Sequence, residues 1–206
     1  MSSQKTREKP HPEVRSPQRR RGRERVAALL RAGEEIFAEK GFDAATMTEI
    51  AARAGASIGS LYQFFPTKEL LADTLQDVNG DALSRMLDAL EEAAKGAKPA
   101  TLVDRLFRDL SAFLEAHPAF AVLSDRPAAD KAKKAERRQR MRGQIAALLV
   151  AMDPPLSRER AERMAVIVLH LMRISVAISG EAELAIREDV LSDLRRMLIR
   201  QIEEES

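Results

Sequence analysis

The chain has 206 residues, of which 45% are hydrophobic, 32% are charged and only 4% are aromatic. That length can bury a substantial core, and the scarcity of Gly and Pro, nine of each, favours helix nearly everywhere. The absence of Cys excludes a disulfide framework and a thiolate zinc site, and three widely separated His residues, His11, His117 and His170, argue against a His-built metal site.

Positive charge is concentrated at the N-terminus. Residues 1–25 hold nine Lys and Arg against three Glu, although the net charge of the whole chain is only +2. We expect residues 1–22 to be a disordered basic arm, which fits either a polyanionic partner or a merely solvated tail. The N-terminus has no apolar signal core, and the apolar stretch 164–179 is too short and too polar for a membrane span. A cytoplasmic protein without a membrane partner is therefore expected.

Apolar residues recur at three- and four-residue spacing along most of the chain, which is typical of helices with one buried face. Gly41 is expected to end the first helix with a left-handed residue, and Thr46 with Glu49 to form a capping box at the second. Ser57 and Thr67 are expected to cap the third and fourth helices. No strand pattern or internal repeat is visible. We therefore predict an all-α protein of about nine helices, at residues 23–40, 46–54, 58–64, 67–94, 101–116, 118–124, 127–152, 157–179 and 181–204.

Two of these helices are very short and are joined through residues 54–57, as in a helix-turn-helix. The second begins with Ile58, Gly59 and Ser60, so its N-terminal end can approach another surface closely. In this motif that end enters the major groove of DNA, where small polar side chains read base edges. Lys68 stands in the first turn of the next helix, where a cation opposes the helix dipole unless a phosphate lies beside it.

The segment GFDAATMTEIAARAGASIGSLYQFFPTKELL, residues 41–71, resembles the DNA-binding signature of the TetR family of bacterial transcriptional regulators. The resemblance covers roughly residues 23–75. It implies a three-helix helix-turn-helix domain at 23–75 and a helical effector-binding and dimerisation domain at 76–206. It also implies a homodimer, usually a repressor, that leaves its double-stranded operator when a small molecule binds. The alternative for the motif is a structural helical hairpin that does not bind DNA.

Carried over residue by residue, the resemblance implies DNA contacts for Thr46, Ser57, Ile58, Ser60, Tyr62, Gln63 and Lys68. Thr46, Tyr62 and Lys68 are assigned to the phosphate backbone, and the other four to the groove. Packing roles are implied for Ile50, Ala51, Ala54 and Leu61. Phe64 stands where the family often has His or Tyr, and because Phe cannot donate a hydrogen bond, we expect it to pack instead.

The effector is expected to bind among apolar side chains of the C-terminal helices. The candidate residues are Met86, Phe107, Phe113, Phe120, Met141, His170, Met172 and Arg173. A cavity among them would suit a largely apolar molecule with one polar or anionic end. The alternative for most of the Phe and Met residues is an ordinary core, where such residues at helical spacing usually lie, and the alternative for His170 and Arg173 is a dimer interface at which other groups satisfy them.

Dimerisation is expected to use the last two helices, which together with their copies form a four-helix bundle. The candidate interface residues are Val168, Leu171, Ile174, Ser175, Ile178, Leu184, Leu191, Leu194, Leu198 and Ile202. The alternative is that both apolar stripes pack within one chain.

The remaining features favour no other function. The basic run at residues 131–142 is expected to be a solvated helix face rather than a second nucleic-acid site. No Gly-rich phosphate loop, zinc signature or nucleophile elbow is present, so we expect no enzyme, cofactor or metal. An architectural DNA-binding protein without an effector is the last alternative, and the size of the C-terminal part argues against it.

Overall fold

The computed structural model describes residues 17–124, 126, 130–181 and 183–206, which form ten helices and no strand. The helices are α1 (Pro17–Ala44), α2 (Met47–Arg53), α3 (Ile58–Phe64), α4 (Lys68–Ala89), α5 (Glu91–Ala94), α6 (Pro99–Ala116), α7 (Ala119–Ser124), α8 (Lys131–Ala151), α9 (Arg158–Gly180) and α10 (Arg187–Glu205). The all-α prediction is confirmed. The additional helix arises because the predicted helix 67–94 is divided at Leu90 into α4 and the short α5.

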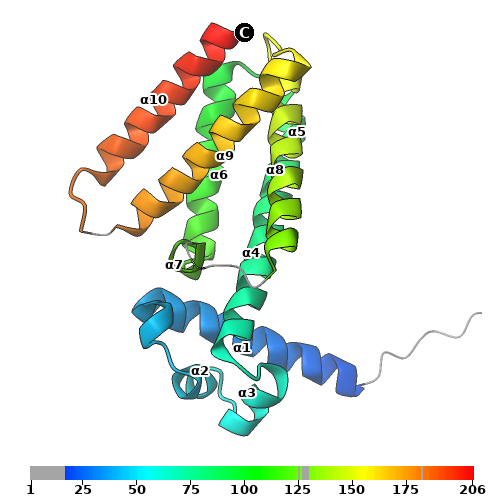
Figure 1. Ribbon diagram of the computed structural model, residues 1–206, viewed down its shortest axis with the longest axis vertical. Helices are drawn as coiled ribbons and strands as arrows, with labels where there is room; N and C mark the ends of the chain where they lie inside the picture. Colours follow the sequence, from blue (N-terminus) through cyan, green and yellow to red (C-terminus); the bar gives the residue numbers. More distant parts are fainter. Residues whose placement is uncertain (1–16, 125, 127–129, 182) are drawn as a thin grey trace, which may run out of the picture.

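The helices form two units that α4 joins (Figure 1). The N-terminal unit consists of α1, α2, α3 and the first half of α4, and the C-terminal bundle contains the rest of α4 together with α5, α6, α8, α9 and α10. Each unit has its own cluster of buried apolar side chains. A displacement of α4 within the bundle therefore reaches the N-terminal unit directly.

The predicted caps of the N-terminal unit are present, whereas Gly41 kinks α1, which continues to Ala44, instead of ending it in a left-handed helical conformation. Gly41 interrupts α1 with φ 78° and ψ 171°, a conformation that is essentially restricted to glycine. Thr46, Ser57 and Thr67 cap the helices α2, α3 and α4 through side-chain oxygens that accept backbone N–H groups. Two boundaries differ clearly from the prediction. The predicted arm 1–22 is helical from Pro17 onward, with residues 1–16 outside the described part of the chain, and the last helix begins at Arg187 rather than at residue 181.

The short helix α7 joins the two units, although it lies far from the N-terminal unit in sequence. Ala119 and Leu123 are fully buried in the core of the N-terminal unit, whereas Phe120 and Ala121 pack against the core of the bundle. A carboxylate oxygen of Glu34 on α1 accepts the Ala119 N–H at 3.1 Å. A displacement of α7 relative to one core therefore also changes its contacts with the other core.

The helix α9 corrects the expectation that its apolar stretch is too short to span a membrane. It has 23 residues and is, by length and composition alone, long and apolar enough to cross a membrane. Eight of its side chains are nevertheless buried in the chain's own core, where α9 packs against α8 and α10. It is the central core helix of the bundle.

Candidate nucleic-acid interface and ligand pocket

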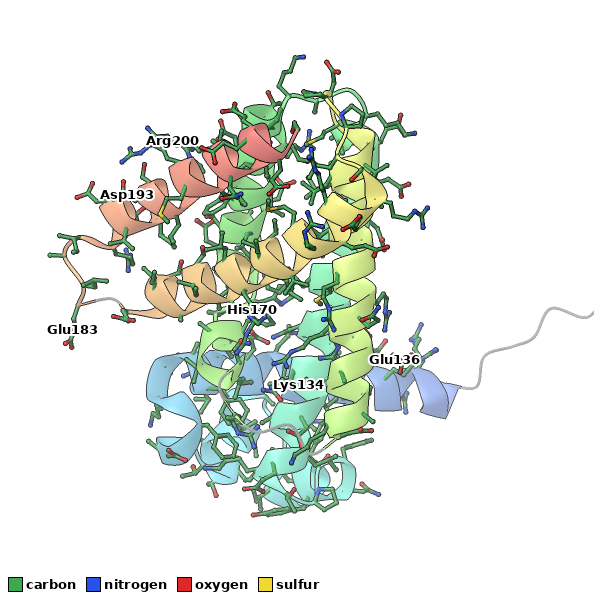
Figure 2. The ribbon with its side chains drawn as sticks, turned by 45° about the horizontal axis from the view of Figure 1, so that its top comes forward. Lys134, Glu136, His170, Glu183, Asp193 and Arg200 are labelled. Atoms are coloured by element: carbon green, nitrogen blue, oxygen red, sulfur yellow. The ribbon has the colours of Figure 1, made fainter. Side chains whose placement is uncertain are left out.

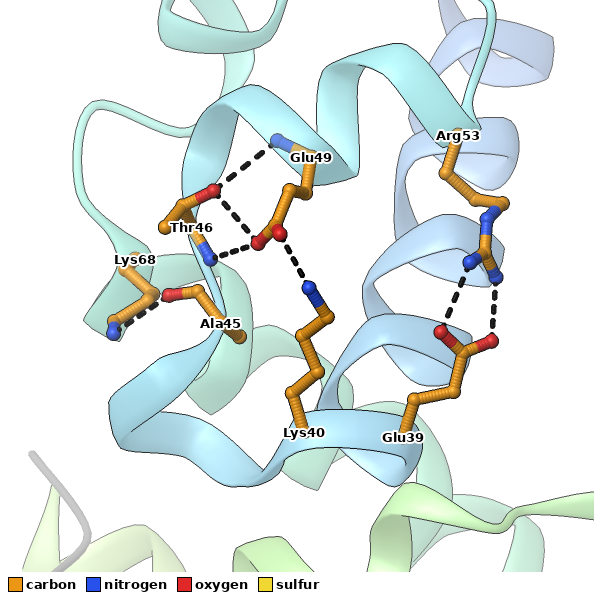
Figure 3. Close-up of polar contacts among 7 residues, drawn as sticks. All are labelled: Glu39, Lys40, Ala45, Thr46, Glu49, Arg53 and Lys68. Carbon is orange, nitrogen blue, oxygen red and sulfur yellow. Dashed lines mark hydrogen bonds and ion pairs between the residues drawn. The ribbon is translucent and has the colours of Figure 1, made fainter.

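The start of α2 is held by a complete capping box (Figure 3). The Thr46 hydroxyl oxygen accepts the Glu49 N–H at 3.3 Å, and its own proton goes to a carboxylate oxygen of Glu49 at 2.8 Å. The Thr46 N–H is donated to the same carboxylate oxygen at 3.1 Å. The predicted cap is present, but both Thr46 donors are used inside the chain, so a phosphate contact from Thr46 would require one of these bonds to break.

Ion pairs and hydrogen bonds between charged side chains connect α2 to α1. Lys40 Nζ lies 2.5 Å from a carboxylate oxygen of Glu49, and the Arg53 guanidinium makes two bonds to Glu39, at 2.8 and 2.9 Å, and one to Glu35 at 2.9 Å. The hydrogen bond from Arg53 lowers the pKa of Glu39, and Glu39 in turn raises the pKa of Arg53. The sequence analysis missed Arg53. The four-residue spacing of Glu35 and Glu39 on one helix face was the available signal.

The Glu49 carboxyl gives this arrangement a pH dependence. Hydrogen bonds from Lys40, then from the Thr46 side chain and backbone, lower the pKa of Glu49 from 4.5 to about 2. Its charged form therefore stabilises the folded state fully above pH 4.5, and this contribution is lost as the pH falls through about 2. In an NMR titration the Glu49 carboxyl is expected to titrate near pH 2. Lys40→Met should raise its pKa, and a midpoint near 4.5 in the parent chain would contradict the assignment.

Lys68 is engaged by the chain's own backbone (Figure 3). Its Nζ lies 2.7 Å from the carbonyl oxygen of Phe42, 3.1 Å from that of Asp43 and 2.9 Å from that of Ala45, and 4.5 Å from the centroid of the Phe42 ring. An ammonium has three N–H donors, and all three are used. The predicted phosphate contact is therefore not available in this conformation. Lys68 instead ties the turn between α1 and α2 to the start of α4.

The other predicted DNA contacts lie on α3 or at its N-cap. Ile58, Tyr62 and Gln63 are exposed, and Ser57, also exposed, caps the helix by accepting the Ser60 N–H at 3.2 Å. The opposite side of α3 is anchored, as predicted, by packing residues of the N-terminal unit: Ile50, Ala51 and Leu61 are buried, and Ala54 and Phe64 pack partly buried beside them. The result is a short helix with one face in the core and the predicted reading face in solvent.

Gly59 stands in the middle of this exposed face. A Cβ atom at Gly59 would have no heavy atom of the chain within 4 Å, and its φ is not positive. Neither packing nor backbone conformation therefore demands glycine here, although glycine costs a helix up to about 1 kcal/mol relative to Ala. A close approach by something outside the chain would explain this residue.

A cavity of about 580 Å³ lies between α4, α7, α8 and α9. Five of the eight predicted effector residues line it: Phe120, Met141, His170, Met172 and Arg173. The other three, Met86, Phe107 and Phe113, do not. Phe113 is buried against the Phe120 ring at 5.0 Å, and Met86 and Phe107 are half-buried elsewhere on the core. The cavity also touches Leu70 and Asp73 near the start of α4, so it reaches the element that carries the N-terminal unit.

Ion pairs close the cavity on the α4 side. Lys133 and Arg137 of α8 both bind the carboxylate of Asp77, and Arg137 also donates to the carbonyl of Gln76 at 3.2 Å. Burial raises the pKa of Asp77, but the bonds from Lys133 and Arg137 outweigh burial and lower it overall. Gly80 allows this contact, because a Cβ there would lie 2.6 Å from Arg137. The basic run is thus not only a solvated face.

A second contact links the cavity to the N-terminal unit. The guanidinium of Arg126 lies over the Phe42 ring, 3.7 Å from its centroid, and 3.5 Å from a carboxylate oxygen of Asp73. Phe42 is also the residue whose carbonyl and ring Lys68 contacts. The end of α1 therefore touches both the start of α4 and the segment that follows α7.

The predicted dimer interface is partly wrong. Within the single chain Val168 is only 2% exposed and Leu198 1%, and Ser175 and Ile202 are equally buried, so these four belong to the core. Leu171, Ile178, Leu184, Leu191 and Leu194 are half-buried, and Ile174 is exposed. Ile167, which directly precedes the buried Val168 on α9, faces outward and is 44% exposed. The periodicity identified the apolar helices but not which side faces the chain's own core.

Among the described residues, no group of three or more His, Asp or Glu is placed to hold a metal ion.

Residues 29–75 match the family model described as "Bacterial regulatory proteins, tetR family". This match covers the four helices of the N-terminal unit from the middle of α1 onward.

Curated relatives resemble the same part of the chain. The HTH-type transcriptional repressor Rv3405c of Mycobacterium tuberculosis is 38% identical over 85 residues, which are 41% of this chain and 42% of that protein. The HTH-type transcriptional activator FasR of Mycolicibacterium smegmatis is 44% identical over 68 residues, 32% of this chain and 31% of that protein. The chain thus matches less than half the length of these two transcriptional regulators.

Solved structures resemble nearly the whole fold. A TetR-family transcriptional regulator from Streptomyces coelicolor superimposes with a TM-score of 0.64 at 21% identity, covering 88% of this chain and 99% of that one. A TetR-like transcriptional regulator from Rhodococcus sp. RHA1 gives a TM-score of 0.61 at 21% identity, covering 86% and 94%. At this identity the likeness concerns the fold, including the C-terminal bundle that the sequence motif does not cover.

Proposed function

We propose that this chain is a member of the TetR family of bacterial regulatory proteins and a sequence-specific DNA-binding regulator of transcription, located in the cytoplasm; the match of residues 29–75 and the resemblance to the repressor Rv3405c support this proposal. The observation that carries this proposal is the reading face of α3. Ile58, Tyr62 and Gln63 are exposed on a helix whose other face is locked into the core, with Gly59 leaving open space between them. Such a surface suits insertion into the major groove.

The direct test is selection of bound sites from random double-stranded DNA with the full chain. We expect a palindromic site with half-sites about one helical turn apart, because a two-fold dimer presents two copies of α3. Binding measured by fluorescence anisotropy should weaken steeply with salt. If no sequence is enriched, the proposed function is wrong.

Gly59→Leu tests the reading face without disturbing the fold. Since Gly59 has open space around it, stability should be unchanged or rise by up to about 1 kcal/mol from better helix propensity. Affinity for the selected site should fall about a hundredfold or more, because the side chain holds α3 away from several base contacts.

Gly143→Leu is the matched control for this variant. A Cβ atom at Gly143 would also have no heavy atom of the chain within 4 Å, and this residue lies on α8 in the C-terminal bundle. The control should leave DNA binding unchanged. Equal DNA affinity of Gly59→Leu and the parent chain would contradict the placement of α3 in the groove.

We propose a homodimer formed through α9 and α10. Large apolar side chains remain exposed on these two helices and just before α10: Val166, Ile167, Ile174, Ile186 and Met197. Their counterparts on a second copy would cover them in the bundle of four helices that the sequence analysis anticipates. The half-buried Leu191 and Leu194 would flank this contact.

We propose further that the protein is a repressor released by a small molecule in the cavity. The cavity borders α4 and α7, and these are the two elements that reach the core of the N-terminal unit. A ligand that displaces them would change the spacing of the two reading heads, and operator DNA must weaken ligand binding by the same factor. Expression of a reporter gene controlled by the selected site should rise when the gene for this protein is deleted. A fall in expression would show that the protein is an activator. This cavity also favours a ligand-responsive regulator over an architectural DNA-binding protein.

A further inference from the structure

The floor of the cavity between α4, α7, α8 and α9 is apolar. Six buried side chains from four helices line it: Leu83, Leu110, Met141, Leu169, Met172 and Val176. The volume of about 580 Å³ lies within the range of small-molecule sites. The floor therefore suits the hydrocarbon part of a ligand, and the ligand's polar part must be recognised elsewhere in the cavity.

The carboxylates that line the cavity are already engaged. Asp77 binds Lys133 and Arg137, and Asp73 lies 3.5 Å from Arg126. Asp130 caps α8 by accepting the Lys133 N–H at 2.9 Å. None of these three acids is left over to neutralise a cation at the α8–α9 side of the cavity.

Two guanidinium groups lie on that side without such a partner. Arg138 of α8 and Arg173 of α9 both line the cavity, and within the described part of the chain neither guanidinium has a hydrogen bond or an ion pair. Burial lowers the pKa of Arg138, and the nearby charges of Arg173 and Arg142 lower it further. His170 lines the same side one turn before Arg173, and Figure 2 shows it between the upper bundle and the N-terminal unit. Like charges held together in this way would be stabilised by an anion.

We propose that this cavity binds an amphipathic organic anion, with its hydrocarbon body on the apolar floor and a carboxylate head between Arg138 and Arg173. A guanidinium fork matches a carboxylate in geometry and charge, and two forks from two helices can hold its two oxygens. The inference rests on the proposed function, because it names the chemical class of the effector that releases the operator.

The test uses two carboxylates, decanoate and naphthoate, and their uncharged counterparts, decanol and naphthalenemethanol, in calorimetric titrations of the full chain. Each carboxylate is expected to bind about tenfold or more tightly than its alcohol, because a hydrogen bond to a charged group adds that much. Arg138→Gln and Arg173→Gln should each reduce the affinity for carboxylate by a similar factor and leave the affinity for alcohol unchanged. Arg140→Gln, an exposed residue of α8 that does not line the cavity, is the matched control and should change neither.

Binding of the selected operator by the same variants without ligand separates this inference from the proposed function. If neither carboxylate binds, or acid and alcohol bind equally in every variant, the inference is wrong even where the operator is bound. If the carboxylate preference follows Arg138 and Arg173 but no operator can be selected, the cavity assignment holds and the proposed regulator does not.

Discussion

A chain with Glu in place of both Ile167 and Met197 is expected to be a monomer with intact helicity. Ile167 is 44% exposed and Met197 63%, so neither change places a charge in the chain's own core. Across the proposed α9–α10 interface, each Glu would be buried opposite its copy without a partner. Operator affinity should fall about a hundredfold or more, because a monomer loses the second, effectively intramolecular half-site contact. Light scattering and anisotropy measure the two effects.

Two matched variants show whether a lower mass in light scattering reports loss of the proposed interface. Val150→Glu replaces an apolar residue on α8 that is 44% exposed, as Ile167 is, and lies outside the proposed interface; this variant should remain dimeric. Leu198→Glu places the charge in the core, where Leu198 is 1% exposed, and should unfold the bundle rather than merely dissociate it. A dimer of unchanged mass for the Ile167 and Met197 variant would rule out this interface.

Replacing Lys68 by Met is expected to lower stability by about 2 kcal/mol, since three hydrogen bonds from a charged donor are lost and three carbonyls must find water. Met retains the stem beside the Phe42 ring, so the loss reports the hydrogen bonds rather than packing. Thermal unfolding should shift down by about 4–8 °C for a chain of this size.

The salt dependence of DNA binding separates this backbone tie from the phosphate contact that the sequence suggests. Loss of a phosphate contact reduces the slope of log affinity against log salt by about 0.9. We expect the slope for folded Lys68→Met to equal that of the parent chain. A reduced slope with unchanged stability would show that Lys68 leaves its three carbonyls for the DNA. Lys131→Met, at the exposed start of α8, serves as the control and should change neither quantity.

Much of the N-terminal unit could be predicted from the sequence because its signals are local. The capping box of Thr46 and Glu49, the Ser57 cap and the positive φ of Gly41 involve residues within a few positions of one another. The buried position of Ile50 follows from helical spacing, and that of Leu61 from the resemblance to the TetR signature. Such features are determined by short-range geometry, so the chain specifies them before its distant parts meet.

Tertiary structure decided the contacts that depend on distant segments. Long side chains such as Lys68, Arg53 and Arg137 bind whichever acceptors the fold brings near, and these lie between 14 and 61 positions away in sequence. Leu123 of α7 likewise depends on the fold, because it completes the core of the N-terminal unit from a distant part of the sequence. An apolar stripe along α9 predicts a buried face, but only the packed neighbours α8 and α10 determine that Val168 points inward and Ile167 outward. The spacing of apolar residues shows that a single helix has a buried face, whereas the direction of that face depends on the helices packed against it.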